Sequence, residues 1–213
     1  MKKGSGTTLN NLDTTHTSLG SSVMPAPKLK SLLLRSKTLY HGSNQVGLPE
    51  LSIAKRDTVG SGAYLTSNMR TAADYACFRS EKWGGEPRGY RARVSNLRML
   101  DARDPASVSA VLSGFHKKLV GLIRNGETTD WHTQQILGDV ANKIGNGEIG
   151  PHNLRKATDA LGPHFSEHCK GLGFHGLVIQ EGGEGNMKRH DTYLVFDPAN
   201  VKTLRETKLR AKA

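Results

Sequence analysis

The sequence contains little cysteine and few aromatic side chains. Only Cys77 and Cys169 are present among 213 residues, and phenylalanine, tryptophan and tyrosine together make up 6%. Two cysteines cannot build the disulfide framework of a small secreted domain, and these two do not form a CxxC metal pair. Both lie where apolar residues recur at helical spacing, so we expect free thiols in a reducing compartment.

Long apolar runs are also missing. A bilayer span needs about 18 consecutive apolar residues, and no segment approaches that length. The run LKSLLL at 29–34 is short and close to lysines, which also excludes it as the core of a signal peptide. We therefore expect no membrane span.

Several motifs of catalysis and cofactor binding are absent. The GSG at 60–62 lacks the third glycine of a dinucleotide fingerprint, because position 65 is Leu65, and a strand pattern rather than a helix follows it. There is no GxxxxGK[ST] phosphate loop, no GxSxG elbow and no HExxH pair, and the nine histidines have no cysteine partner at zinc spacing. These absences argue against a Rossmann dehydrogenase, a P-loop enzyme, a serine hydrolase and a zinc site.

Acidic residues are outnumbered by basic ones, but the excess is confined to the ends of the chain. Thirty lysines and arginines against nineteen aspartates and glutamates give a formal charge of +11. Residues 1–38 carry +5 and residues 200–213 carry +4, which leaves only +2 for residues 39–199. Grooves for nucleic acid depend on clustered lysine and arginine. The near-neutral body is a poor candidate for such a groove, and the basic ends suit tethering, delivery or solubility.

Composition divides the chain into a leader, one domain and a short tail. Residues 1–36 are dominated by Ser, Thr, Gly, Asn and Pro without apolar periodicity, and we expect a disordered basic leader there. Such acid-poor segments are typical of organelle transit peptides, of the leaders of injected bacterial effectors and of simple solvated tails. The remainder suits one hydrophobic core, which we assign to 37–204, followed by a basic tail at 205–213.

Apolar spacing within the domain predicts strands and helices in an order typical of α+β proteins. Short apolar-polar segments bounded by turn residues indicate strands at 38–43, 62–67, 90–100, 173–180 and 192–197. Helical spacing indicates helices at 69–78, 108–123, 131–144 and 153–161, and after Pro163. Asn68 and Asp130 are the expected helix caps. Because strands and helices do not alternate one for one, we expect an α+β fold and not a βαβ sheet.

Three short segments combine residue types that suit chemistry. Tyr40-His41-Gly42-Ser43 ends the first predicted strand, Gly62-Ala63-Tyr64-Leu65 begins the second and is followed by Tyr75, and Asp191-Thr192-Tyr193-Leu194-Val195-Phe196-Asp197 begins the last. In order and spacing this set resembles the NAD-dependent ADP-ribosyltransferases of the diphtheria-toxin and poly(ADP-ribose) polymerase type. The resemblance covers about residues 38–204, apart from a helical insertion at about 104–168. It implies split antiparallel β-sheets with flanking helices.

The resemblance also implies NAD as co-substrate, no metal, and a binding site made of His41, Gly42, Ser43, Tyr64 and Tyr75. These residue types fit the task. A mostly neutral His41 ring can bond a ribose hydroxyl, and Gly42 presents backbone groups to the carboxamide with no Cβ in the way. Tyr64 and Tyr75 can sandwich the flat, partly cationic nicotinamide ring, at about 0.5–2 kcal/mol each.

The catalytic acid is the main departure from the family pattern. Where the polymerase-type pattern has glutamate directly before the tyrosine of the last strand, this sequence has Thr192, with Asp191 one position earlier. We take Asp191 as the acid that stabilises the oxocarbenium-like charge, acting with His41 and Tyr64 as the catalytic set. Because side chains alternate along a strand, Asp191 needs a bulge or a turn to face the cleft.

The glycine-rich loop at 181–190 offers alternative acids, Glu184 and Glu181. It lies where the family presents a target-recognition turn, and it also suits an ordinary solvated hairpin loop. An enzyme that keeps Thr192 and is limited to single transfers is a third alternative.

The resulting hypothesis is a mono-ADP-ribosyltransferase that moves ADP-ribose from NAD to a macromolecular acceptor and releases nicotinamide. A protein acceptor is preferred, a nucleic acid is second and a small molecule third. A toxin, an effector acting in a host cytoplasm or a phage-encoded modifier would suit the small size and the leader. Two alternatives stay open: a catalytically reduced NAD-fold binding module, and an RNA 2′-phosphotransferase, for which Arg35 and Arg70 do not supply a convincing phosphate site.

Overall fold

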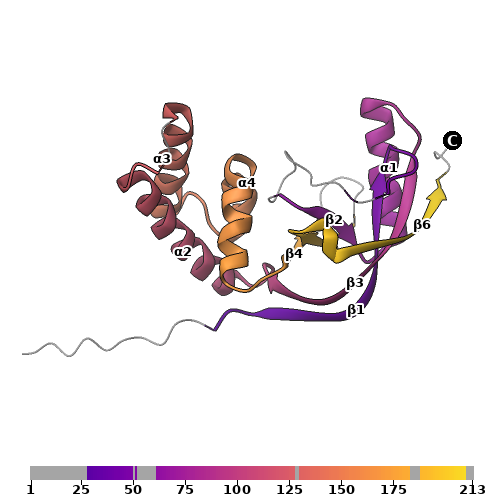
Figure 1. Ribbon diagram of the computed structural model, residues 1–213, viewed down its shortest axis with the longest axis horizontal. Helices are drawn as coiled ribbons and strands as arrows, with labels where there is room; N and C mark the ends of the chain where they lie inside the picture. The colour runs from indigo at the N-terminus through magenta and orange to yellow at the C-terminus, as the bar shows by residue number, and fades with distance from the viewer. Residues whose placement is uncertain (1–27, 50, 52–60, 128–129, 183–187, 210–213) are drawn as a thin grey trace, which may run out of the picture.

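The computed structural model describes residues 28–49, 51, 61–127, 130–182 and 188–209. The strands found there are β1 (Ser31–Ser43), β2 (Ala63–Thr66), β3 (Arg88–Asp101), β4 (Gly176–Glu181), β5 (His190–Val195) and β6 (Val201–Lys208). They form one sheet in the order β1-β2-β5-β4-β3-β6, in which β1 also pairs with β3. Figure 1 shows these two long strands side by side. The long strand β3 therefore pairs with β1, β4 and β6.

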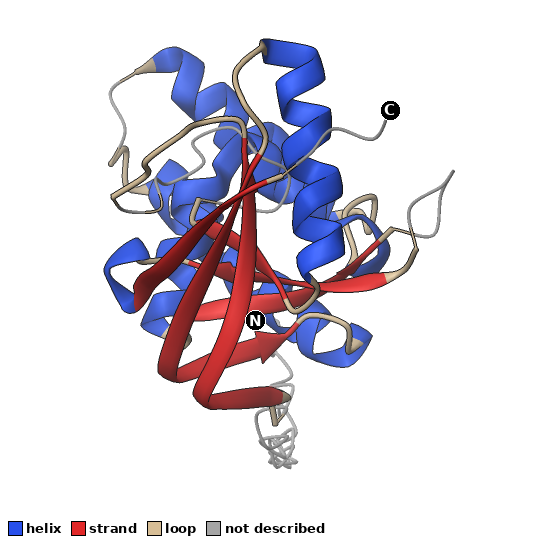
Figure 2. Cartoon of the chain, turned by 90° about the vertical axis from the view of Figure 1, so that its right-hand side faces the viewer, coloured by secondary structure: helices blue, strands red, loops and turns tan. Residues whose placement is uncertain are grey.

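Strand pairing divides this sheet into two antiparallel groups. β3 pairs antiparallel with β1 along nearly its whole length and with β6 over its first half, while β5 lies antiparallel between β2 and β4. The groups meet at the Tyr40–Thr66 pair between β1 and β2 and at a short parallel pairing of β3 with β4. Figure 2 shows the strong twist of the strands. With the flanking helices, this arrangement confirms the predicted α+β class.

Burial along β3 follows the period of two that a half-buried strand requires. Tyr90, Ala92 and Val94 are at most 1% exposed, whereas the intervening Arg91 and Arg93 are exposed. The apolar face of β3 therefore joins the core, and its charged face meets solvent.

β4 is buried on both faces, and its side chains alternate between two apolar clusters. Leu177 and Ile179 pack with the helices that lie between β3 and β4 in the chain, whereas Val178 packs with apolar residues of β1 and β3. The sheet thus separates two apolar cores, and β4 lies between them. Glu181 is the last residue of this strand.

α1 (Met69–Trp83) packs against β1 and is capped by Asn68, as predicted. The Asn68 side-chain oxygen accepts a hydrogen bond from a first-turn backbone N–H at 2.8 Å. The helix approaches β1 so closely that a β-carbon on Gly42 would lie 1.9 Å from the Ala72 carbonyl oxygen. Only glycine fits at that position. α1 runs five residues past its predicted end and stops at Gly84, whose φ of +76° suits glycine.

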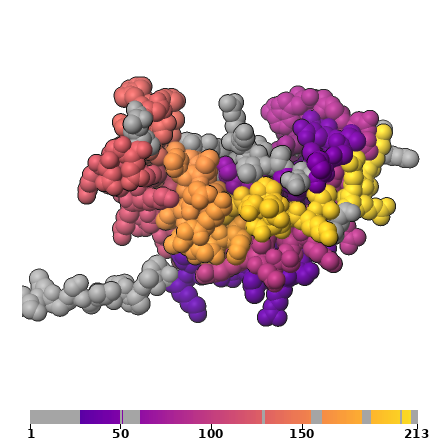
Figure 3. Space-filling view, in the orientation of Figure 1, coloured from indigo at the N-terminus to yellow at the C-terminus, as the bar shows by residue number. Residues whose placement is uncertain are grey.

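The predicted helical insertion forms a group of its own. It comprises α2 (Pro105–Arg124), α3 (Trp131–Gly145), the 3₁₀ turn η1 (Pro151–Asn153) and α4 (Leu154–Gly171). Asp104 and Asp130 cap α2 and α3 by accepting hydrogen bonds from first-turn backbone N–H groups. In Figure 3 these helices, red to orange, stand apart from α1, in magenta. None of the described helices combines the length and the apolarity needed to cross a bilayer.

α4 joins two helices that the sequence predicts separately, at 153–161 and after Pro163. Leu161 has φ −128° and ψ 30°, outside the helical range, and lies two residues before Pro163. A proline lacks the backbone N–H and crowds the preceding turn. The kink therefore occurs at the predicted break.

Two strands extend beyond their predicted limits. β1 begins at Ser31, six residues before the predicted domain boundary at 37, and β6 runs to Lys208, through the first residues of the predicted tail. Both pair with β3 through backbone hydrogen bonds, which need no apolar alternation in the added strand. The rest of the predicted leader (1–27) and of the tail (210–213) lies outside the described residues.

Candidate active site

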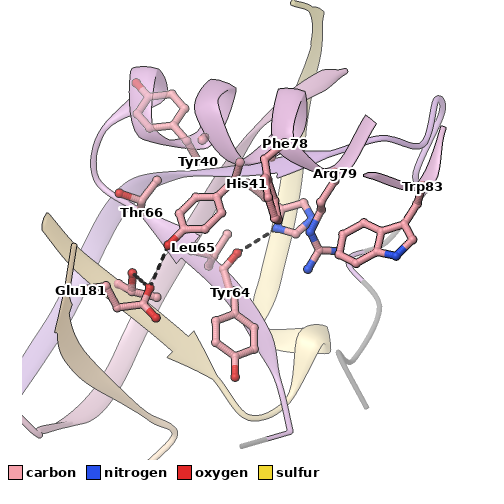
Figure 4. A pocket seen from close by; sticks show the side chains of 13 residues that line it. Tyr40, His41, Tyr64, Leu65, Thr66, Phe78, Arg79, Trp83 and Glu181 are labelled. Atoms are coloured by element: carbon pink, nitrogen blue, oxygen red, sulfur yellow. Dashed lines mark hydrogen bonds between the residues drawn. The ribbon is translucent and has the colours of Figure 1, made fainter. Parts of the chain in front are cut away.

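A narrow cavity of about 200 Å³ lies between β1, β2 and α1, beside the neighbouring ends of β4 and β5. It brings together side chains from all three predicted segments. Its lining residues are Tyr40, His41, Gly42, Tyr64, Leu65, Thr66, Ala72, Tyr75, Phe78, Arg79, Trp83, Glu181 and Thr192. Figure 4 shows His41 near its centre, Glu181 toward one end and Trp83 at the other.

His41 is held by the backbone of β2. Its Nδ1 lies 2.8 Å from the Tyr64 carbonyl oxygen, and because a carbonyl only accepts, Nδ1 carries the hydrogen and donates it. In the neutral ring Nε2 is then the acceptor. The buried Tyr90 ring lies 6.4 Å from the His41 ring, centroid to centroid. These contacts fix both the orientation and the tautomer of the imidazole.

Gly42 and Ser43 follow His41 but have different surroundings. Gly42 lines the cavity, and its missing side chain serves the close packing of β1 on α1. Ser43 is 4% exposed and does not line the cavity; its Oγ accepts a hydrogen bond from the Gln45 backbone N–H at 3.1 Å. The structure therefore brings Gly42 to the candidate site and leaves Ser43 buried at the end of β1, outside the cavity.

Both tyrosines predicted to clamp a ring line the cavity, Tyr64 from β2 and Tyr75 from α1. The Tyr64 ring extends away from His41, although its carbonyl faces that residue (Figure 4). The Tyr75 hydroxyl donates to Glu181 Oε2 at 3.3 Å. Burial, and after it the negative charge of Glu181, raise the pKa of Tyr75 far above its usual value. Tyr75 therefore stays a protonated donor to the carboxylate.

Among the described residues that line the cavity, Glu181 is the one that carries a carboxylate. Thr192 Oγ1 donates a hydrogen bond to Glu181 Oε2 at 2.5 Å, and Tyr75 donates to the same oxygen. Glu181 and Thr192 come from neighbouring antiparallel strands, in which Glu181 pairs with His190 and Thr192 with Ile179. Thr192 occupies the position of the glutamate in the resembled pattern. Glu181 brings a carboxylate beside that position from the adjacent strand.

His190 flanks this carboxylate. Its Nδ1 donates to the Lys188 carbonyl oxygen at 2.9 Å, and its Nε2 lies 4.0 Å from Glu181 Oε2. The His190 side chain is 7% exposed, and its ring meets the Tyr75 ring edge-on at 6.0 Å. The imidazole therefore closes off one side of the Glu181 carboxylate from solvent.

Asp191 lies outside the cavity, on the opposite face of β5. Its Oδ2 accepts a hydrogen bond from Arg103 at 2.8 Å, and Arg103 also donates to the buried Asp101. β4 and β5 pair in continuous register through this position, so the described residues of these strands lack the bulge that Asp191 needs to face the cleft. Of the two alternative acids, Glu181 is in the cavity, and Glu184 lies outside the described residues.

A second cavity, of about 600 Å³, adjoins the first, and Tyr75 and Glu181 line both. Its other walls come from Arg103 after β3, from Gln180, and from residues 151–154 at the start of α4. The helical insertion, which matches nothing in the resembled pattern, thus contributes a wall next to Glu181.

The lining residues at the C-terminal half of α1, Phe78, Arg79 and Trp83, were not predicted as site residues. Arg79 and Trp83 lie beyond the predicted helix end at 78, so this part of the wall was missed. The usable signal is the spacing i, i+4, i+8 from Tyr75 to Arg79 and Trp83, which puts the three side chains on one face of a helix.

The geometry suits the stabilisation of a developing positive charge. A carboxylate in a cavity with aromatic walls, oriented by two hydroxyls that donate to one of its oxygens, interacts with a cation more strongly than it would in water. Next to it, His41 and the tyrosine rings can hold a flat, polar ligand.

The comparisons with known proteins give one match. No protein-family model matches this chain, and no curated protein matches it in sequence. A chain of the crystal structure of the M. tuberculosis MbcT-MbcA toxin-antitoxin complex is similar in structure, with a TM-score of 0.43 and 11% sequence identity. The match covers 82% of this chain and 84% of that chain.

Proposed function

We propose that this protein is an NAD-dependent mono-ADP-ribosyltransferase that transfers ADP-ribose to a macromolecular acceptor, a protein in preference to a nucleic acid. The observation that carries the proposal is the position of Glu181. Its carboxylate lies in the same cavity as His41 and Tyr75 and accepts the Thr192 hydroxyl. The order and spacing of the HGS, GAYL and TYLVFD segments support NAD as the co-substrate.

In this reaction the bond between ribose C1′ and the nicotinamide nitrogen breaks. The electron pair stays on the nitrogen, so the cationic ring leaves as neutral nicotinamide. A nucleophile of the acceptor forms the new bond to C1′ and releases its proton to solvent or to a nearby base. Positive charge develops on the ribose while the first bond breaks, and a nearby carboxylate lowers the barrier.

We assign the carboxylate role to Glu181 and not to Asp191. Asp191 is paired with Arg103, and it does not line the cavity. Glu181 is held by two neutral hydroxyls, which orient the carboxylate and leave its negative charge in place.

The other lining residues bind and orient NAD. His41 Nε2 accepts a ribose hydroxyl, while Nδ1 stays bonded to β2. The Tyr64 and Tyr75 rings pack against the nicotinamide, whose positive charge favours aromatic faces. Gly42 offers its backbone groups to the carboxamide.

Single transfer and a protein acceptor rest on two further features. Thr192 stands where the resembled pattern has the glutamate associated with chain elongation. The near-neutral body between the basic ends lacks the excess of lysine and arginine that binding to a nucleic-acid backbone requires.

The test is incubation of the full chain with NAD and a whole-cell extract, with nicotinamide release and labelling from ³²P-NAD as readouts. We expect release that depends on the extract, and one mass increment of ADP-ribose on a protein band. Glu181→Gln abolishes both signals, and Asp191→Asn, the matched change of the neighbouring acid, retains them.

Two results would overturn the proposal. NAD binding without nicotinamide release in any extract identifies a binding module. Label that is lost on nuclease treatment identifies a nucleic-acid acceptor. Growth arrest on expression of the wild type, and normal growth with Glu181→Gln, would support a role as a toxin.

A further inference from the structure

The C-terminal half of α1 extends the cavity beyond the catalytic end with an aromatic and cationic surface. Phe78, Arg79 and Trp83 line the cavity, and Lys82 lies against the same rings. We call these four residues the α1 ledge. Phe78 and Trp83 are 53% and 58% exposed, so large apolar rings remain open to solvent at the cavity mouth.

The side chains of the α1 ledge contact one another. The Phe78 and Trp83 rings meet edge-to-face at 6.2 Å. Lys82 Nζ lies 4.9 Å from the centre of the Trp83 ring, and the Arg79 guanidinium lies 5.8 Å from it. Two positive charges therefore accompany an exposed indole, at distances where cations and aromatic faces attract each other.

The two ends of the cavity differ in charge. Glu181 provides a negative charge at one end, and Arg79 and Lys82 provide positive charges at the other. Tyr75, Arg79 and Trp83 follow each other at four-residue spacing along one face of α1. The eight-residue step from Tyr75 to Trp83 spans about 12 Å of helix axis. The helix face thus presents an aromatic ring, then a cation, then a second aromatic ring.

NAD has the matching order of groups: a cationic ring and its ribose, then a diphosphate with two negative charges, then an adenine. We propose that the α1 ledge binds the ADP half of NAD, with the adenine stacked on Trp83 and the diphosphate held by Arg79 and Lys82. The orientation rests on the proposed function, because it assumes that the nicotinamide lies at the Glu181 end. The ledge selects a dinucleotide over nicotinamide mononucleotide, which lacks the adenylate.

Intrinsic tryptophan fluorescence tests the ledge directly. The sequence has two tryptophans, Trp83 and Trp131, and Trp131 is 72% exposed on α3 in the insertion. In the Trp131→Phe protein the tryptophan signal comes from Trp83 alone. We expect ADP to quench it with saturation, and nicotinamide mononucleotide to leave it nearly unchanged. In the Trp83→Phe protein, ADP leaves the Trp131 signal unchanged.

Affinity measurements on variants then assign the roles. Base stacking on an aromatic side chain is a substantial part of nucleotide binding, so Trp83→Ala should weaken ADP binding about tenfold by calorimetry. Arg79→Gln should weaken ADP more than adenosine, because adenosine has no phosphate. Arg124→Gln, which removes an exposed arginine at the far end of α2, is the matched control and should change neither. Unchanged unfolding midpoints confirm that each variant is folded.

The outcomes separate this inference from the proposed function. If Trp83→Ala and Arg79→Gln keep the wild-type KM for NAD in the nicotinamide-release assay, the ledge proposal is wrong and the enzymatic proposal stands. If ADP quenches Trp83 while no extract supports nicotinamide release, the ledge stands and the enzymatic proposal is wrong. Quenching by a peptide or oligonucleotide pool in place of ADP would show that the ledge serves a macromolecule and overturn the assignment.

Discussion

The hydroxyl of Thr192 donates a 2.5 Å hydrogen bond to the carboxylate of Glu181 on the adjacent strand. Thr192 occupies the position at which the resembled pattern carries its acid, so the contact shows how a carboxylate reaches the same corner of the cavity from β4 in place of β5. Tyr75 donates to the same oxygen and limits its movement.

Neutralising Glu181 and Asp191 in separate variants distinguishes the roles of the two acids. We expect Glu181→Gln to lower the turnover number for nicotinamide release by about 100-fold or more, the range for lost electrostatic stabilisation of a transition state. Asp191→Asn should stay within about threefold, because this carboxylate faces Arg103 outside the cavity. Initial rates at saturating NAD give both values. A large loss in Asp191→Asn with an active Glu181→Gln would return the role to Asp191.

Placing a glutamate at 192 is expected to reduce activity. Thr192→Glu restores the residue of the family pattern, so the pattern taken alone would favour a gain if the acid were one position out of reach. In the structure Thr192 is 4% exposed and directly contacts Glu181, so the change puts two carboxylates side by side and removes a hydrogen-bond donor. We expect lower nicotinamide release and a lower unfolding midpoint at pH 7 than in Thr192→Ser, the matched variant that keeps the hydroxyl. Higher activity than wild type would contradict this placement of Glu181.

His41 should act mainly on the binding of NAD. Removing the imidazole in His41→Ala takes away the acceptor for the ribose and the contact with the Tyr64 carbonyl. We expect a rise in KM for NAD of about tenfold, in line with the loss of one or two hydrogen bonds. His132→Ala, an exposed histidine at the start of α3, is the control and should leave KM unchanged. An unchanged KM in His41→Ala would place NAD elsewhere.

The two thiols should differ in reactivity. Burial raises the pKa of Cys169 to about 12, and the residue is fully buried, whereas Cys77 is half-buried. Because the thiolate is the reactive form, Cys169 should be inert in the folded protein at pH 8. Titration with an aromatic disulfide reagent should give one fast thiol in the native protein and two in denaturant. Cys77→Ser should remove the fast reaction, and fast modification of Cys169 would contradict the burial.

The ion pair of Asp101 and Arg103 should make stability depend on pH in the acid range. The hydrogen bonds from Arg103 hold the pKa of Asp101 below its usual value. A carboxyl whose pKa is lowered by folding stabilises the fold above its unfolded pKa of about 4, and this stabilisation is lost as pH falls through the lower folded value. We expect Asp101→Asn to lower the free energy of unfolding by about 1–3 kcal/mol near pH 7. Its difference in unfolding free energy from the wild type should shrink below about pH 4.

The control for that measurement is Asp139→Asn. Asp139 forms an exposed pair with Lys143 on α3, with side chains 57% and 44% exposed. Pairs of this kind contribute little, so the change should stay within about 0.5 kcal/mol in urea unfolding. If the loss of unfolding free energy in Asp101→Asn does not change with pH, packing and not charge explains that loss.

Much of the fold could be predicted from local patterns. Asn68 and Asp130 cap the helices at which the sequence places them, and the helical spacing from Val108 to Leu119 corresponds to the buried stripe of α2. The strand β6 was missed, because it adds charged residues to the edge of β3 and shows no apolar alternation. β6 forms because β3 supplies its backbone hydrogen-bond partners. Because β3 is far away in the sequence, the residues around β6 do not reveal this partner.

Part of the candidate site could likewise be predicted from the sequence, and part could not. His41, Tyr64 and Tyr75 could be predicted because each belongs to a short segment with recognisable residue types. The choice between Asp191 and Glu181 could not, because it depends on the register of β4 against β5. Trp83 and Arg79 were missed because the helix continues past the residues that made it recognisable.

Tyr75 and Glu181 form a partition between two cavities, one bounded by α1 and the other by the start of α4. A nucleophile arriving through the larger space would meet the reacting carbon without displacing the dinucleotide. Both substrates could then be present at once. Initial-rate plots should therefore show intersecting lines, the signature of a sequential mechanism with a ternary complex, and the chain would need no covalent intermediate of its own.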